Sequence, residues 1–157
     1  MTPGDLRTRL YVSSNSAYWL GVAGSQARPA FQNPLDLLLQ HQDETGRFYG
    51  FLHSTWIAAS VLFMAGDRYS DAASKGFQLL MDRPLSEWAD SEISWTLGSL
   101  GGAGPARGHP CVGQSLADIL RRRRPDASWV CEDREALTVG ASIETLKVLK
   151  LYGLLPS

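Results

Sequence analysis

The chain has 157 residues, of which 44% are hydrophobic and 20% are charged. That composition suffices for one soluble globular domain, and no stretch is apolar for long enough to cross a bilayer. With 15 basic and 16 acidic side chains, the net charge of −1 excludes a general electrostatic attraction to nucleic acid or to an anionic membrane, so neither is an expected partner.

The start of the chain and its cysteines indicate the compartment. Residues 1–7 lack the basic segment followed by an apolar region that is typical of a secretion signal. The two cysteines, Cys111 and Cys131, are too few for a disulfide framework, and we expect both to be free thiols. These features predict a cytoplasmic protein.

The N-terminal part, residues 1–29, predicts two short helices. Residues 3–10 have the character of a short helix or arm. The polar run from Ser13 to Ser16 supplies N-caps for a second helix over residues 17–23, which Gly24 ends.

The next segment predicts a helical hairpin. Asn33 and Pro34 are a helix-start signal, because asparagine caps a helix and proline suits its first turn, and this helix should run to about Gln42. A turn then leads to Phe48. The strongly apolar run at residues 53–65 predicts a buried helix.

A second hairpin follows. Residues 69–81 are amphipathic and predict an outer helix, which Pro84 terminates. Residues 87–100 predict an inner helix. The Gly101–Pro110 stretch is rich in glycine and proline and is expected to be the longest loop, unable to continue a helix.

The third hairpin consists of an amphipathic helix over residues 112–123 and a last helix over residues 134–151. The four consecutive arginines from Arg121 to Arg124 either contact phosphate or complement the negative C-terminal end of the helix, and the second interpretation is favoured. No strand pattern of comparable strength occurs.

The spacing of three aromatic residues predicts a repeat. Phe48, Trp88 and Trp129 are separated by 40 and 41 residues, and a serine flanked by a small and an aliphatic residue follows each of them by 11 to 13 residues. Two landmarks thus recur in phase. We expect one all-α domain over residues 1–157, with N-terminal helices at 1–29 and hairpin repeats at 30–66, 69–104 and 112–153.

The segments that end at these aromatics resemble a known motif, Q-x-x-x-G-x-W. Gln42-x-x-x-Gly46-x-Phe48 matches it with phenylalanine in place of tryptophan, whereas the segments that end at Trp88 and Trp129 keep only the aromatic and a small residue. In such a turn the glutamine is expected to satisfy helix-end backbone groups while the aromatic packs against the next hairpin.

By this motif the chain resembles the terpenoid cyclase and protein prenyltransferase superfamily, whose α/α toroid alternates outer and inner helices. The resemblance implies antiparallel helical hairpins of α/α-toroid type. About three and a half repeats are too few for a full ring, so a half-toroid or arc is expected. A homodimer would then close the ring or cover an open apolar face.

The resemblance also implies a site, because the N-terminal ends of the inner helices meet at the mouth of a toroid cavity. Cyclases of this superfamily protonate an alkene or epoxide with an aspartic acid and stabilise the resulting cations with aromatic faces. The catalytic candidates at these helix starts are Asp90, Asp133, Glu132 and His53. The substrate-binding candidates are Trp56, Trp95, Glu92 and Phe48.

Each candidate also has a structural interpretation. Acidic residues are favoured in the first turn of any helix, where the dipole stabilises the ionised form. A lone histidine at a helix start is often structural, and Trp56 and Trp95 stand at a helical spacing at which aromatics usually pack in a core. The Gly101–Pro110 loop, which contains His109, is either a lid or a connector.

Two functions follow as hypotheses. The first is a cofactor-independent cyclase or isomerase of an apolar natural-product precursor, terpenoid or polyene-like, in an aromatic-lined helical pocket without a metal. The alternative is a non-catalytic helical-repeat binding or scaffold module for a protein partner.

Overall fold

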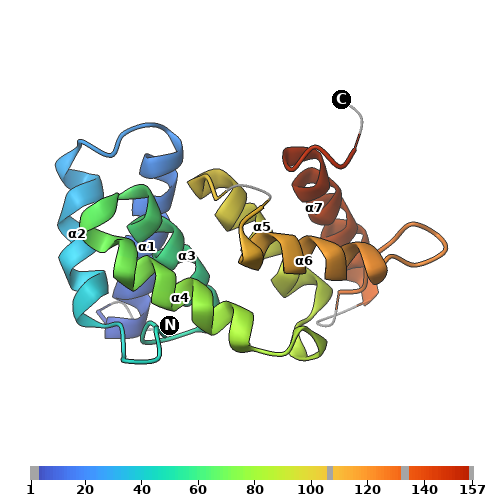
Figure 1. The fold of residues 1–157 in the computed structure, drawn as a ribbon, viewed down its shortest axis with the longest axis horizontal. Coiled ribbons are helices and arrows are strands. Elements are labelled where there is room, and N and C mark those ends of the chain that lie inside the picture. The colour runs from blue at the N-terminus through green and yellow to red at the C-terminus, as the bar shows by residue number, and fades with distance from the viewer. Residues whose placement is uncertain (1–3, 106–107, 132–134, 156–157) are drawn as a thin grey trace. The chain divides into compact units, whose positions relative to one another are not determined.

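The computed structural model describes residues 4–105, 108–131 and 135–155 (Figure 1). These residues form seven α-helices and three short 3-10 helices, and they contain no strand. The predicted all-α class is confirmed, whereas a toroid arrangement of the hairpins stays a prediction. The helices fall into two compact units, one of residues up to Asp82 together with 102–104, and one of residues 83–101 together with the chain from 105 onward.

The first unit is built around a buried helix. Helix α1 (Leu6–Val22) packs against α2 (Pro29–Gln40) and α3 (Leu52–Met64), and α3 packs against α4 (Ser70–Asp82). Every residue of α3 from Ser54 to Leu62 is buried, as its apolar sequence predicts. Helix α4 buries only one face, which confirms its prediction as an amphipathic helix.

The N-terminal prediction of two short helices is wrong, because α1 is one continuous helix of 17 residues. Asp5 caps it, accepting a hydrogen bond from the Arg7 amide at 3.3 Å. The serines expected to act as N-caps lie inside the helix. Ser14 is buried there, and its hydroxyl donates to the Tyr11 carbonyl at 3.0 Å. The hydroxyl therefore has a hydrogen-bond partner without capping a helix.

Helix α2 also starts earlier than predicted. Pro29 stands at its first turn, and Pro34 lies within the helix instead of starting it. The Phe31 and Gln32 amides already donate to the Arg28 carbonyl, so the first turn is complete before Asn33 is reached. Within the helix, Pro34 costs the one hydrogen bond that its missing N–H would have made.

The second unit contains α5 (Asp90–Ala103), α6 (Pro110–Arg121) and α7 (Thr138–Leu151). Buried hydroxyls join α5 to α7, because the Ser94 and Thr145 oxygens lie 2.6 Å apart. The Tyr152 hydroxyl adds a bond to the Leu97 carbonyl at 3.1 Å. Polar groups in this interface are therefore satisfied by each other.

The prediction that residues 101–110 cannot continue a helix is wrong at both ends. Helix α5 continues to Ala103, and Gly101 within it lies close to Leu151, where an added Cβ would clash with a methyl group. At the other end Pro110 begins α6, and the His109 ring accepts a hydrogen bond from the Cys111 amide at 3.3 Å. Sequence alone does not distinguish a glycine that breaks a helix from one that permits packing.

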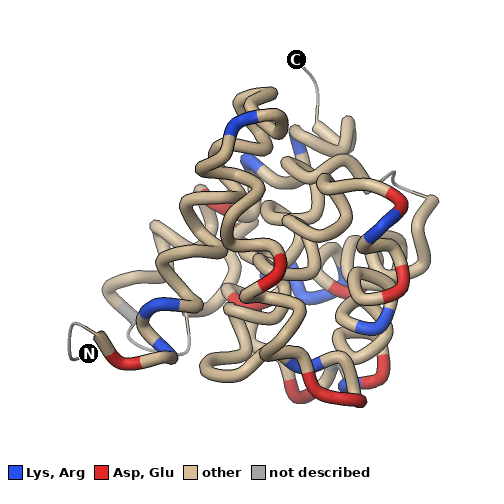
Figure 2. Tube along the Cα trace, turned by 90° about the vertical axis from the view of Figure 1, so that its left-hand side faces the viewer, with Lys and Arg blue, Asp and Glu red and all other residues tan. Residues whose placement is uncertain are grey.

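Charged residues are interspersed along the chain (Figure 2). Several lie on helix surfaces in pairs of opposite sign one turn apart, such as Lys75 with Asp71 at 2.9 Å and Lys147 with Glu144 at 2.6 Å. Such exposed pairs add little stability. Of the described helices, none combines the length and apolar character that crossing a bilayer requires.

Candidate functional site

The segments that end at Phe48 and Trp129 fold as the same turn. The residue two positions before the aromatic has a positive φ in both, +90° at Gly46 and +65° at Ala127. Its amide donates to the carbonyl three residues earlier, at 3.0 and 2.9 Å respectively. The residue five positions before the aromatic donates to the one immediately before it, at 2.9 and 3.0 Å. The two copies therefore share one backbone design despite different side chains.

The segment that ends at Trp88 folds differently. It forms a 3-10 helix over Leu85–Glu87, and the Glu87 amide donates to the Pro84 carbonyl at 2.9 Å. Its resemblance to the other two lies in the burial of the aromatic. Exposure is 1% for Phe48, 4% for Trp88 and 1% for Trp129.

Gln42 joins the first turn to the next helical hairpin. Its side-chain amide donates to the Gly46 carbonyl at 3.1 Å and to the Ala72 carbonyl of α4 at 2.8 Å. Gly46 itself presses on α4, since a Cβ there would lie 2.3 Å from the Lys75 carbonyl oxygen. The glutamine was expected to satisfy helix-end backbone groups; it does bond backbone carbonyls, but one lies in the turn and the other inside α4.

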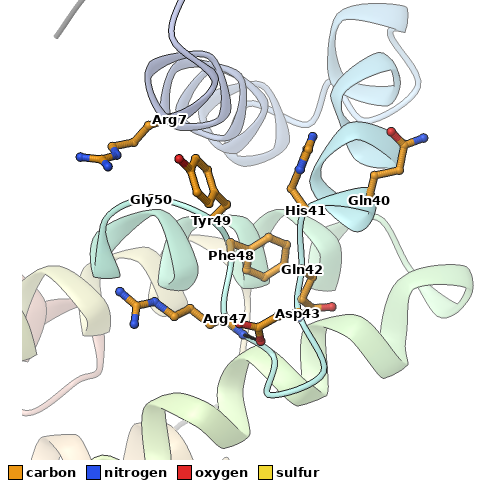
Figure 3. Close-up of a pocket in the computed structure, with 9 residues that line it drawn as sticks. All are labelled: Arg7, Gln40, His41, Gln42, Asp43, Arg47, Phe48, Tyr49 and Gly50. Carbon is orange, nitrogen blue, oxygen red and sulfur yellow. Dashed lines mark hydrogen bonds between the residues drawn. The ribbon is translucent and has the colours of Figure 1, made fainter.

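A groove of about 510 Å³ opens beside this turn (Figure 3). Arg7 reaches it from α1 and Gln40 from the end of α2, and the turn that leads to α3 supplies the remaining side chains. The lining residues are Arg7, Gln40, His41, Gln42, Asp43, Arg47, Phe48, Tyr49 and Gly50. Of the residues predicted for the site, Phe48 alone lines this groove, and its ring is buried.

His53 lies near the start of α3, as predicted, in a cluster of aromatic rings. Its ring stacks on Phe51 with 5.0 Å between centroids, meets Tyr11 edge-on at 4.9 Å, and lies 6.0 Å from Trp56. Burial lowers the pKa of His53 below its ordinary value, because the apolar surroundings disfavour the charged ring. The imidazole is therefore neutral at pH 7.

Asp90, the first catalytic candidate, is part of a buried ionic network. One of its oxygens accepts from Arg122 at 3.2 Å and the other from the Val130 amide at 2.9 Å. Arg122 also donates to the Asp118 carboxylate at 2.6 Å and to the Trp88 carbonyl. A carboxylic acid ready to protonate a substrate would have to give up one of these two acceptor bonds. The geometry thus favours the structural interpretation of this residue.

The other candidates that the structure describes differ in their surroundings. Glu92 accepts from the Ala89 amide at 3.1 Å and lies 3.6 Å from Arg83, so it caps the start of α5. Trp95 is 48% exposed, which corrects its interpretation as a core residue, whereas Trp56 is 3% exposed and packs as one. Glu132 and Asp133 lie outside the described residues.

The groove residues that were not predicted for the site include Arg7, His41, Arg47 and Tyr49. His41, Arg47 and Tyr49 flank or lie within the best copy of the motif, so the motif could have indicated them. No local sequence pattern indicated Arg7, because the packing of α1 on α3 brings it to the turn.

The described residues form neither a group of metal ligands nor an activated Cys111 thiol. No three histidine, cysteine, aspartate or glutamate side chains come together there as metal ligands. Both cysteines are free and buried, and burial raises the pKa of Cys111 to about 11. Its thiol is therefore protonated and unreactive at neutral pH.

Neither a family model, nor a curated protein, nor a solved structure matches this chain. Its class is therefore defined by its own features: the described residues are helical, an aromatic turn that recurs in two copies joins helices, and a groove opens at the best copy of that turn.

Proposed function

We propose that this protein is a non-catalytic helical-repeat binding module whose partner is a second copy of the same chain, bound through the outer face of α7. The observation that carries the proposal is a stripe of exposed apolar side chains on that helix. Val139 is 70% exposed, Ile143 47% and Leu146 41%. Their spacing places them on one side of the helix.

The opposite side of α7 already packs in the unit, where Thr145, Val148 and Leu149 are buried. The helix is thus apolar on two sides, a pattern typical of helices that are covered all round. In helical-repeat proteins each hairpin covers the next. The outer face of α7 is apolar and exposed among the described residues, and a second copy of the chain would cover it.

A second copy fits this stripe better than an unrelated partner does, because charged residues of both signs lie beside the stripe. Glu144 and Lys147 lie beside it and pair with each other at 2.6 Å. Two antiparallel copies of α7 can exchange these pairs, each glutamate facing the lysine of the other copy. The surface is therefore self-complementary, as a two-fold interface requires.

Replacing Ile143 with lysine is expected to abolish the dimer, because the new charge lies in the middle of the apolar stripe. Sedimentation equilibrium should show a dimer for the unchanged chain and a dissociation constant raised at least about tenfold for the variant. The matched control is Leu39→Lys, which changes a residue of α2 that is 42% exposed and should leave the dimer intact. A monomeric unchanged chain, or equal effects of both substitutions, contradicts the proposal.

A cyclase or isomerase of an apolar precursor is a second proposal, and the aromatic cluster around His53 supports it. A neutral imidazole accepts a proton, and the rings of Tyr11, Phe51 and Trp56 offer faces that attract a cationic intermediate. Because burial lowers the pKa of His53, such a base would still act at pH 6.5 and would lose activity only at lower pH.

Incubation with a linear isoprenoid polyene, followed by gas chromatography and mass spectrometry, tests this activity. His53→Gln is expected to reduce product formation at least about a hundredfold, whereas His41→Gln should not. Absence of product from the unchanged chain, or full turnover by His53→Gln, would rule the second proposal out.

A further inference from the structure

We propose that the groove beside the first aromatic turn binds a small organic anion, in which a carboxylate or phosphate group is held by Arg7 and Arg47 and a flat apolar part lies on Tyr49. This site is independent of the α7 surface and of His53 as a base.

Among the described residues, the two arginines of the groove form no salt bridge, although the charge of Arg47 acts on the nearby Asp43 carboxylate. Arg68, Arg83, Arg121 and Arg122 each form a salt bridge. Within the ranges that the structure describes, neither Arg7 nor Arg47 lies within salt-bridge distance of an acidic side chain. Figure 3 shows both guanidinium groups extending to the same side of the turn. The forked donors of arginine suit the oxygens of a carboxylate or phosphate.

Arg7 is held in position before any ligand arrives. Its guanidinium lies over the Phe51 ring at 5.3 Å from the centroid. Its aliphatic stem runs against Gly50, where an added Cβ would lie 3.0 Å from the Arg7 Cγ. Glycine at this position leaves room for the arginine, and the cation–π contact orients it, so less conformational entropy is lost on binding.

Asp43, the acidic residue of the groove, is already engaged by its own turn. One of its oxygens accepts from the Thr45 hydroxyl at 2.6 Å, the Thr45 amide at 2.9 Å and the Arg47 amide at 3.1 Å. The Thr45 hydroxyl is the main reason why the pKa of Asp43 lies below its ordinary value. The carboxylate therefore stabilises the turn, and the two arginines outnumber it in the groove.

Tyr49 supplies the apolar surface. Its side chain is 51% exposed, yet its backbone is fixed by a hydrogen bond from its amide to the His41 carbonyl at 3.0 Å. In Figure 3 its ring stands between Arg7 and His41. An exposed aromatic on a rigid turn next to two cations suits a ligand with both a ring and a negative group. The groove volume of about 510 Å³ admits a molecule of that size.

Calorimetric titration with phenyl phosphate, benzoate and inorganic phosphate tests the site. Phenyl phosphate should bind with a dissociation constant of about 0.1 mM, and Arg47→Gln should weaken it at least about tenfold. Tyr49→Ala should weaken phenyl phosphate and leave inorganic phosphate unchanged, since only the ring contact is lost. Comparison of benzoate with phenyl phosphate shows whether the site binds both carboxylates and phosphates or phosphates alone.

Arg68→Gln is the matched control, because Arg68 is an exposed arginine of the same unit outside the groove, and it should bind all probes as the unchanged chain does. Circular dichroism should show that Arg47→Gln, a change of an exposed side chain, keeps the helical fold. The site is disproved if no probe binds saturably up to about 10 mM, or if Arg68→Gln and Arg47→Gln weaken binding equally.

Discussion

Replacing Arg122 with methionine is expected to lower the free energy of unfolding by about 3–5 kcal/mol, because two buried carboxylates lose their common partner. The side chains of Asp118 and Asp90 are only 4% and 10% exposed, and both accept hydrogen bonds from Arg122. Without the guanidinium, Asp90 loses its arginine partner, and Asp118 is left with its salt bridge to the exposed Arg121. Urea unfolding followed by circular dichroism at pH 7 measures the loss.

The same arginine run offers a matched control. Arg123→Met removes an exposed neighbour and should change the free energy of unfolding by less than about 0.5 kcal/mol. Adding Asp118→Asn to Arg122→Met should recover part of the loss, because it removes a buried charge that has lost one of its two arginine partners. If Arg122→Met and Arg123→Met prove equally stable, the buried network does not stabilise the fold.

Replacing Gly46 with alanine is expected to cost about 3 kcal/mol or more, since two penalties combine. The backbone at Gly46 has φ +90°, which disfavours any residue with a Cβ, and the new Cβ would lie 2.3 Å from the backbone oxygen of Lys75. Thermal or urea unfolding measures this loss.

The third copy of the turn supplies the reverse experiment. Ala127 has φ +65° and is the one non-glycine residue with a positive φ among those described. Ala127→Gly should relieve that strain and stabilise the protein by up to about 1 kcal/mol, after the added freedom of glycine in the unfolded chain is subtracted. A stabilised Gly46→Ala or a strongly destabilised Ala127→Gly would refute the shared role of these two positions.

Much of the fold follows from apolar periodicity, because burial of one helix face leaves a local pattern. The amphipathic α4 was predicted for that reason, whereas α3, which is buried on all sides, was predicted from its continuous apolar run. Helix boundaries depend instead on tertiary contacts. A serine inside α1 is the same residue type as a serine that caps a helix. Gly101, which lies against Leu151, is likewise the same residue type as a glycine that ends one.

The candidate site was predicted less well, because its side chains meet across long separations. An aspartate at a helix start, such as Asp90, can be a helix cap, a catalytic acid or a member of an ion pair. The ion pair is formed with Arg122, which lies 32 residues later in the chain. The groove likewise joins Arg7 of α1 to a turn that starts after α2. Sequence reasoning did locate the turn itself, since the Q-x-x-x-G-x-F pattern is contiguous.

The two equivalent turns reach their common backbone by different side-chain bonds. In the turn that ends at Phe48, Asp43 accepts from the amide and hydroxyl of Thr45 at 2.9 and 2.6 Å. In the turn that ends at Trp129, Asp126 makes the corresponding bonds to Ser128 at 3.0 and 2.7 Å, but two positions closer to the aromatic. The two copies thus differ in the position of the aspartate and in having glycine or alanine at the residue with positive φ. What both copies retain is the path of the main chain and the buried ring at its end.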